Sequence, residues 1–216
     1  MLLSSLALPE FFTNHYTKFP NLTPVQEKSI NAGLLDTNSL LVCAPTASGK
    51  TLVATMAIAK HLEQGHKAIY LVPLKALASE KFKEYQRLLE GTKFKVIMSI
   101  GDLDSSSNYL SNYDLLILTT EKLDSLLRHK VNWLTAVRVV VIDEIHLLND
   151  PKRGPTLEVI LTLLKLLIKP QLIGLSATIG NPDELATWLE ATLVSDDWRP
   201  VELKKGICVK GKTEFY

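Results

Sequence analysis

Short apolar runs alternate with longer segments of helical periodicity, and this alternation constrains the fold more than any other feature of the chain. The runs cover residues 39–43, 68–72, 95–100, 114–118, 137–142 and 172–175. Most are apolar almost throughout, as expected for strands that are buried on both faces of a parallel sheet. Helices are expected over residues 51–62, 74–89, 121–129, 156–167 and 182–190. The alternation predicts an α/β fold, with one open sheet between two layers of helices.

Length and composition indicate one globular domain. A chain of 216 residues is long enough for one well-buried core and short for two. Hydrophobic residues make up 46% and charged residues 22% of the chain, which is typical of folded proteins. The formal net charge is +1, so any contact with nucleic acid must come from local patches.

The chain lacks the usual signals of membranes and of disulfide scaffolds. Its two cysteines, Cys43 and Cys208, show no CxxC spacing, which argues against a zinc site and fits a reducing compartment. The first dozen residues lack the basic start and long apolar core of a secretory signal. The apolar stretch 157–168 is too short to span a bilayer and contains Lys165. We therefore expect a soluble, cytoplasmic protein.

In open parallel sheets ligands bind beyond the carboxyl ends of the strands, so the residues that follow each run are the candidates for chemistry. The first run is followed by a string that fits a phosphate-binding loop, with alanine in place of the first glycine. Its members are Ala44, Pro45, Thr46, Ala47, Ser48, Gly49, Lys50 and Thr51. Small residues let main-chain N–H groups surround phosphates, and the following helix adds its positive end. Lys50 would reach the β and γ phosphates and the Thr51 hydroxyl would bind Mg²⁺. The alternative is an ordinary turn between a strand and a helix.

Two adjacent carboxylates follow the fifth run, in the string Asp143-Glu144-Ile145-His146. Carboxylates at the end of a buried strand are costly unless a cation or hydrogen-bond donors satisfy them. Asp143 beside Mg²⁺ and Glu144 beside an attacking water would meet that need. A solvated loop beyond the strand is the alternative.

The sixth run is followed by Ser176-Ala177-Thr178. Small hydroxyl residues in such a place usually cap the next helix. Here the next helix is expected to begin near Pro182, so Asn181 is the predicted cap. The hydroxyls of Ser176 and Thr178 are then free to bond another group, for which we predict His146.

These three strings, in this order, resemble the superfamily-two helicases of the DExH type. Residues 22–26 resemble the adenine-reading glutamine motif of that group. Residues 73–77 and 119–122 resemble its two segments that hold the nucleic-acid backbone, and Gly101-Asp102 resembles the short loop between them. Residues 45–51, 176–182 and 198–200 are similar to the archaeal Hjm-type DNA helicases of the Ski-like group, which act on stalled forks and branched junctions. The resemblance runs from about residue 8 to residue 203, although Thr23 and Val25 stand where that group often has prolines.

The resemblance implies a RecA-like fold that uses ATP and Mg²⁺, with single-stranded or forked DNA as the partner. Gln26 would read the adenine, and residues 44–51 would hold the phosphates. Lys50, Asp143 and Glu144 would be catalytic, with Thr51 and Asp143 on the metal. His146, Ser176 and Thr178 would couple the nucleotide to the strand-holding residues, which are Lys75, Gly101 and Thr120.

The resemblance also divides the chain. Residues 1–20 would be an N-terminal extension, 21–200 the first RecA-like domain, and 201–216 a strand or tail that leads to a second RecA-like domain. That second domain supplies an arginine to the γ-phosphate in such enzymes, and these residues do not include it. We therefore expect a monomer that by itself binds nucleotide weakly and hydrolyses little.

Three alternatives remain at this point. One is an RNA helicase of the same superfamily, although RNA-processing relatives usually carry a different pattern of small residues in the phosphate loop. Another is a nucleotide-gated binding module without turnover. The third is an unrelated ATPase such as a transporter motor, which the absence of a Ser-Gly-Gly-Gln-like string disfavours.

Three cations on one predicted helix, Lys81, Lys83 and Arg87, are interpreted as a solvated face.

Overall fold

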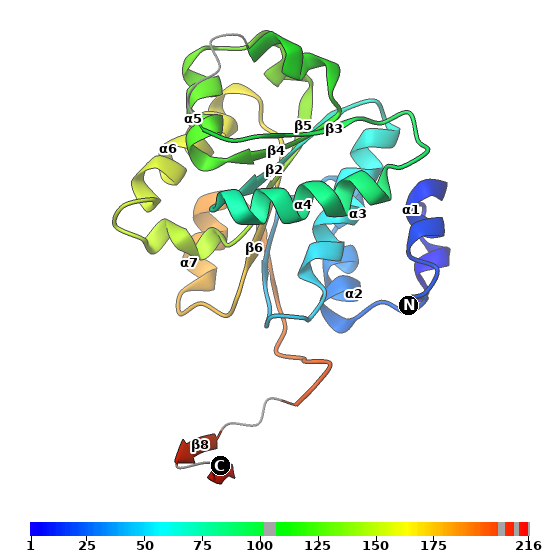
Figure 1. The fold of residues 1–216 in the computed structure, drawn as a ribbon, viewed down its shortest axis with the longest axis vertical. Helices are drawn as coiled ribbons and strands as arrows, with labels where there is room; N and C mark the ends of the chain where they lie inside the picture. The colour runs from blue at the N-terminus through cyan, green and yellow to red at the C-terminus, as the bar shows by residue number, and fades with distance from the viewer. Residues whose placement is uncertain (102–106, 203–205, 210–211, 216) are drawn as a thin grey trace.

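Seven strands form one parallel sheet in a computed structural model that describes residues 1–101, 107–202, 206–209 and 212–215 (Figure 1). The spatial order is β3-β4-β2-β5-β6-β1-β7, and every neighbouring pair is parallel. The strands are β1 (Leu40–Cys43), β2 (Lys67–Val72), β3 (Val96–Ser99), β4 (Leu115–Thr119), β5 (Val137–Ile142), β6 (Gln171–Ser176) and β7 (Thr192–Ser195). The predicted α/β fold with a parallel sheet is confirmed.

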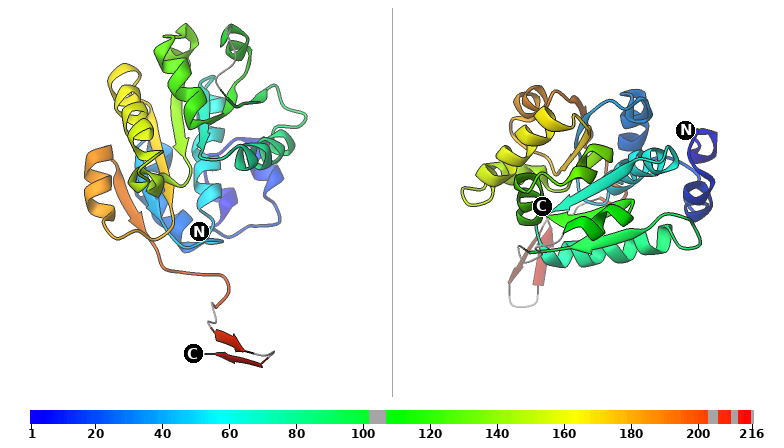
Figure 2. Two further views of the ribbon diagram at one scale, coloured as in Figure 1. Left: turned by 60° about the vertical axis from the view of Figure 1, so that its left-hand side comes forward. Right: turned by 90° about the horizontal axis from the view of Figure 1, so that it is seen from above.

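Helices cover both faces of this sheet (Figure 2). They are α1 (Glu10–His15), α2 (Pro24–Asn31), α3 (Lys50–Glu63), α4 (Lys75–Leu88), α5 (Thr120–Arg128), α6 (Gly154–Leu167) and α7 (Pro182–Leu189). Short 3₁₀ turns connect them: η1 (Leu3–Ser5), η2 (Leu34–Asp36), η3 (Ser107–Asn112), η4 (Asn132–Ala136) and η5 (Ile145–Asn149). No described helix has both the length and the apolarity needed to cross a bilayer.

Alternation along each strand produces two hydrophobic cores, one on each side of the sheet. Val42 and Tyr70 belong to the core under α1 to α4, whereas Leu41 and Ile69 belong to the core under α5 to α7. Since successive side chains of a strand point to opposite faces, both sets must be apolar in a sheet covered on both sides. This explains the nearly continuous apolar runs in the sequence.

The N-terminal residues 1–20 pack against the first core. Leu3 and Phe12 are buried within it, and Leu3 N donates a 2.8 Å hydrogen bond to the carbonyl oxygen of Pro20. The rings of Phe11 and Phe94 lie 5.5 Å apart. After the sheet, β8 (Gly206–Val209) and β9 (Lys212–Phe215) form an antiparallel hairpin where the sequence suggested a single strand or tail.

Candidate nucleotide-binding site

Residues 44–49 connect β1 to α3 and form the turn that the phosphate-loop string predicts. The turn needs two residues with positive φ, Ala47 at 66° and Gly49 at 101°. The main-chain nitrogen of Ala44 donates a hydrogen bond of 3.2 Å to the carbonyl oxygen of Ser176, so the loop is joined to the end of β6. The Ser48 side chain is buried, and its hydroxyl has no hydrogen-bond partner among the described residues.

The ammonium of Lys50 lies inside this loop. It donates hydrogen bonds of 2.5 Å to the carbonyl oxygen of Ala44 and 2.9 Å to that of Pro45. Burial lowers the pKa of Lys50, and the nearby carboxylates of Glu144 and Asp143 partly offset that shift. The cation therefore occupies a place where a negative ligand would be favourable.

Helix α2 is tied to the phosphate loop by its first turn. Thr23 Oγ1 donates a 2.8 Å hydrogen bond to the carbonyl oxygen of Ser48, and Gln26 Nε2 donates one of 3.1 Å to that of Gly49. Gln26 Oε1 accepts a 2.9 Å hydrogen bond from the Thr23 main chain, which is half of a capping box. Gln26 is 3% exposed. Its adenine-reading role stays a prediction.

Asp143 and Glu144 follow β5. Asp143 Oδ2 accepts a 2.9 Å hydrogen bond from the Tyr70 hydroxyl, and Asp143 Oδ1 accepts one of 3.1 Å from the main chain of Glu144. Glu144 has a φ of 52°, a left-handed conformation that is uncommon for a residue with a side chain. Such strain is found preferentially at functional sites.

His146 joins this carboxylate to the end of β6. Its Nδ1 atom lies 3.2 Å from Glu144 Oε2 and 3.5 Å from the hydroxyl of Ser176. Ser176 is fully buried, whereas Thr178 is exposed. The structure thus brings His146 and Ser176 together as the sequence predicts, with the imidazole between the carboxylate and the hydroxyl.

These residues fit a nucleoside triphosphate with Mg²⁺. The loop offers main-chain N–H groups, the unpartnered Ser48 hydroxyl and the Lys50 ammonium to an anion. Among the described residues no three His, Cys, Asp or Glu side chains form a metal site of their own. Mg²⁺ commonly takes one or two protein ligands and completes its shell with phosphate and water. Thr51 and Asp143 are the residues that would supply those protein ligands here.

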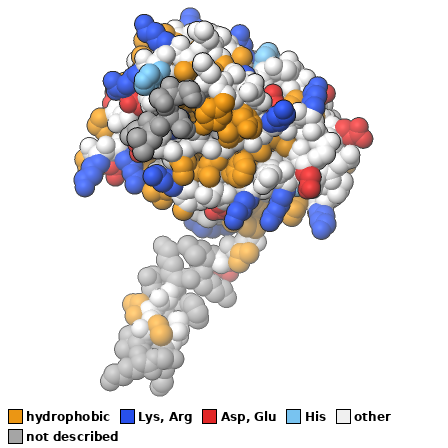
Figure 3. Space-filling model, turned by 45° about the horizontal axis from the view of Figure 1, so that its top comes forward, with side chains coloured by type: hydrophobic (Ala, Val, Ile, Leu, Met, Phe, Trp, Pro, Cys, Tyr) orange, Lys and Arg blue, Asp and Glu red, His pale blue; other side chains and the backbone are white. Residues whose placement is uncertain are grey.

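The three predicted strand-holding residues follow three neighbouring strands. Lys75 is the exposed first residue of α4 after β2, Gly101 has a φ of 86° just after β3, and Thr120 begins α5 after β4. Asp102 lies outside the described residues. On the face drawn in Figure 3, Lys and Arg side chains are scattered among hydrophobic ones and do not gather in one large patch.

The interpretation of Lys81 as part of a solvated face is wrong. Lys81 is 8% exposed, its ammonium lies 2.9 Å from Glu84 Oε2, and it lies 5.7 Å from the ring centroid of Tyr70. It also donates a 3.5 Å hydrogen bond to Thr51 Oγ1. Lys83 and Arg87 are exposed as expected. Helical spacing gives the missed signal, since the buried residues of α4 are Ala78, Lys81, Tyr85 and Leu88.

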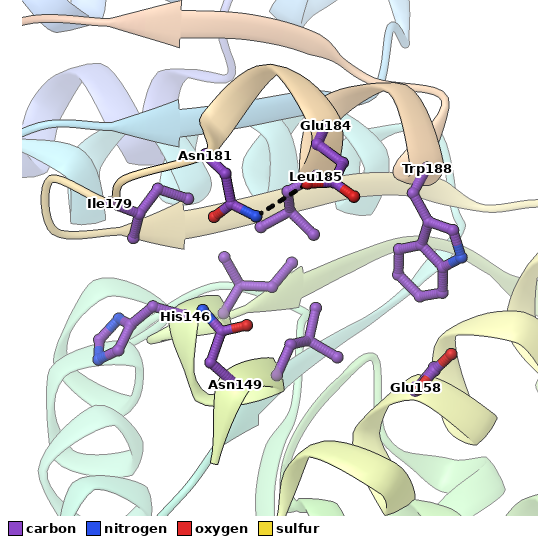
Figure 4. Close-up of a pocket in the computed structure, with 10 residues that line it drawn as sticks. His146, Asn149, Glu158, Ile179, Asn181, Glu184, Leu185 and Trp188 are labelled. Carbon is purple, nitrogen blue, oxygen red and sulfur yellow. Dashed lines mark hydrogen bonds between the residues drawn. The ribbon is translucent and has the colours of Figure 1, made fainter. Parts of the chain in front are cut away.

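A cavity of about 290 Å³ lies beside His146, between η5, α6 and α7 (Figure 4). Its apolar walls include Ile145, Ile179 and Trp188, and Asn181 lines it too.

The prediction that the Asn181 side chain caps α7 is wrong. Asn181 occupies the cap position of α7, yet its side chain makes no capping hydrogen bond; its Nδ2 atom donates instead to Glu184 Oε2 at 3.1 Å.

Comparison with known proteins places this geometry in a family. The family model described as DEAD/DEAH box helicase matches residues 23–185. The chain is 55% identical over 201 residues to the ATP-dependent DNA helicase Hel308 of Methanocaldococcus jannaschii, covering 90% of this chain and 17% of that protein. It is 54% identical over 191 residues to the Hel308 of Pyrococcus abyssi, covering 88% of this chain and 26% of that protein. The chain therefore spans about a quarter or less of the length of these relatives.

Solved structures agree on the fold. The DUF1998 helicase MrfA superposes with a TM-score of 0.73 at 25% identity, over 88% of this chain and 33% of that one. The same helicase bound to DNA gives a TM-score of 0.74 at 24% identity, over 88% and 30%. With most of its sheet, its phosphate loop and its Asp-Glu-Ile-His string inside the matched region, this chain belongs to the DEAD/DEAH box helicase family.

Proposed function

We propose that this chain is the ATP-binding motor domain of a DNA helicase or translocase. One observation carries the proposal. The phosphate loop follows β1, the Asp143–Glu144 pair follows β5, and Ser176 is the last residue of β6. These three strands are adjacent in the sheet in the order β5-β6-β1. Three separate segments of the sequence therefore meet at one edge, where open α/β sheets bind their ligands.

ATP is held by residues 44–51 in this proposal. Lys50 leaves the carbonyl oxygens of Ala44 and Pro45 and pairs with the β and γ phosphates. Thr51 and Asp143 hold Mg²⁺, which when bound offsets the negative charge that develops on the phosphates. Gln26 lies one hydrogen bond from the loop, on the helix that would face the adenine.

Glu144 orients and deprotonates the attacking water. Its carboxylate is partly exposed and lies within 3.2 Å of His146, so it is accessible and held. His146 and Ser176, together with Thr178, transmit the state of the nucleotide to the strand-holding residues. Lys75, Gly101 and Thr120 contact phosphates of one strand, which positions nucleic acid without reading its sequence.

The choice of DNA rests on the relatives, which are named DNA helicases and are identical to this chain at about half of the aligned residues. Single-stranded or forked DNA is the proposed partner, and a cytoplasmic monomer the proposed form. Since the chain spans only part of those relatives, we also propose that a second RecA-like domain supplies the arginine for hydrolysis. In other phosphate-loop enzymes such an arginine raises the rate by about 10³–10⁵. These 216 residues alone should hydrolyse ATP barely.

The deciding experiment uses a polypeptide that joins these residues to a second RecA-like domain. ATP hydrolysis with Mg²⁺ is measured with forked DNA, with single-stranded RNA of equal length, and without nucleic acid. Stimulation by DNA that disappears in the Glu144→Gln variant is the expected result. Clearly stronger stimulation by RNA would overturn the choice of DNA, and turnover that survives the substitution would overturn the role of Glu144.

A further inference from the structure

Tyr70 holds the carboxylate of Asp143 in one orientation. Tyr70 lies in the middle of β2 and is 0% exposed. Its hydroxyl donates a 2.9 Å hydrogen bond to Asp143 Oδ2, while Asp143 Oδ1 accepts 3.1 Å from the main chain of Glu144. Because each oxygen has its own donor on a different segment, the carboxylate cannot rotate without breaking one of the two hydrogen bonds.

The Tyr70 ring is itself fixed by buried neighbours. The ring of Tyr85, also 0% exposed, lies 5.6 Å away at an angle of 56°. The Tyr85 hydroxyl lies 3.1 Å from Thr55 Oγ1. A carboxylate oxygen accepts hydrogen bonds, so the Tyr70 hydroxyl is the donor toward Asp143.

The same group of side chains reaches the other predicted metal ligand. The Lys81 ammonium lies 5.7 Å from the centroid of the Tyr70 ring and donates a 3.5 Å hydrogen bond to Thr51 Oγ1. Each of the two proposed Mg²⁺ ligands thus accepts a hydrogen bond from a buried side chain behind it: Asp143 from Tyr70 on β2, and Thr51 from Lys81 on α4. A purely apolar core would need no hydroxyl on Tyr70, since phenylalanine has nearly the same shape.

We propose that Tyr70 is a positioning residue that orients the Asp143 carboxylate for a divalent cation bound with nucleotide. The inference rests on the proposed ATP site. Carboxylates that bind metals are generally held by hydrogen bonds from residues behind them, and loss of such a partner typically weakens metal affinity by about 10–100-fold. Tyr70 acts through Asp143 and does not touch the nucleotide.

The test is the binding of a fluorescent ADP analogue, mant-ADP, to the 216-residue chain at increasing Mg²⁺ concentrations. Tyr70→Phe keeps the ring and removes the hydroxyl. We expect the Mg²⁺ concentration at half-maximal binding to rise about tenfold, while binding in excess EDTA stays unchanged. An unchanged Mg²⁺ requirement would overturn the inference.

Tyr85→Phe is the matched control, because it also removes a buried tyrosine hydroxyl from the same cluster but one that does not touch Asp143. Urea unfolding confirms that each variant folds. If Tyr85→Phe raises the Mg²⁺ requirement as much as Tyr70→Phe, the effect comes from packing and the inference fails. Asp143→Asn tests the proposed metal site separately from the role of Tyr70. No effect of Asp143→Asn would overturn the proposed metal site and this inference with it, whereas an effect there without one in Tyr70→Phe overturns the inference alone.

Discussion

The side-chain amide of Gln26 donates a hydrogen bond of 3.1 Å to the main-chain carbonyl oxygen of Gly49. The two residues are also in close steric contact, since a Cβ atom built on Gly49 would lie 2.3 Å from Gln26 Nε2. The helix that carries Gln26, the proposed adenine-reading residue, therefore contacts the phosphate loop at a position where a Cβ atom would displace the Gln26 amide.

Gly49→Ala should damage both stability and nucleotide binding. The φ of 101° lies outside the region that alanine prefers, and the new methyl group displaces Gln26. We expect a loss of about 1–3 kcal/mol in the free energy of unfolding, the usual range for a strained backbone position. Urea unfolding gives that loss, and mant-ADP titration should show much weaker binding.

Gly65→Ala provides the control for backbone strain alone. Gly65 has a φ of 78°, and no atom lies within 4 Å of a Cβ built there. Its substitution should cost about 1 kcal/mol and leave nucleotide binding intact. Equal effects of the two substitutions on nucleotide binding would show that the contact between Gly49 and Gln26 is irrelevant to the site.

Lys50→Ala should abolish nucleotide binding without reducing stability. Burial lowers the pKa of Lys50, so keeping this ammonium charged costs free energy in the folded chain. Removing it relieves that cost while taking away the cation proposed to meet the phosphates. Lys60→Ala on the same helix is the control and should bind mant-ADP normally. A Lys50→Ala variant that binds as tightly as the wild type would contradict the proposed site.

His61 should make the chain less stable in mild acid. His61 is 4% exposed, its Nε2 atom lies 2.9 Å from Gln171 Oε1, and its Nδ1 atom lies 3.4 Å from His66 Nδ1. Burial lowers the pKa of His61 below 6.5, and the hydrogen bond that its Nε2 atom donates to Gln171 Oε1 offsets part of that shift. The nearby His66, Lys60 and Arg138 lower the pKa further. Below pH 6.5 the unfolded chain therefore takes up a proton more readily than the folded chain. Stability should fall as the pH drops from 6.5 toward the folded pKa.

Urea unfolding at a series of pH values between 7.5 and 5 measures this effect. In His61→Gln the fall in stability below pH 6.5 should be smaller than in the wild type, because glutamine does not titrate. His129→Gln changes an exposed histidine and should leave the fall unchanged. The explanation fails if both substitutions change the pH dependence equally.

Most of the sheet and its helices followed from the sequence because burial on both faces forces apolar runs. The six expected strands and five expected helices are present, with ends within two residues of those expected. The location of the proposed site followed from the same pattern, since the residues after β1 and β5 meet the end of β6 at one edge of the sheet. These are local patterns combined with a general rule of α/β topology.

Other features depend on tertiary contacts that no local pattern encodes. β7 is too short and too polar to be distinguished from a loop, and it is a strand because it pairs with β1. Phe12 is buried only because α1 packs onto the first core. The helical spacing of α4 predicts that Lys81 is buried, but its contact with the Tyr70 ring depends on a strand far away in the sequence. Tyr70 resembles any core tyrosine until Asp143 is placed at its hydroxyl.

Lys75 and Lys83 give a direct test of the strand-holding surface. Both are exposed on α4, but only Lys75 begins the helix at the carboxyl end of β2, where a phosphate would meet the helix N-terminus. Affinity for single-stranded DNA is measured against salt concentration in the polypeptide that carries both RecA-like domains. Lys75→Ala should weaken binding and reduce the slope of log affinity against log salt by about 0.7, the loss of one phosphate contact. Lys83→Ala should leave the slope unchanged. Equal slopes in the two variants would show that Lys75 does not belong to the strand-holding surface.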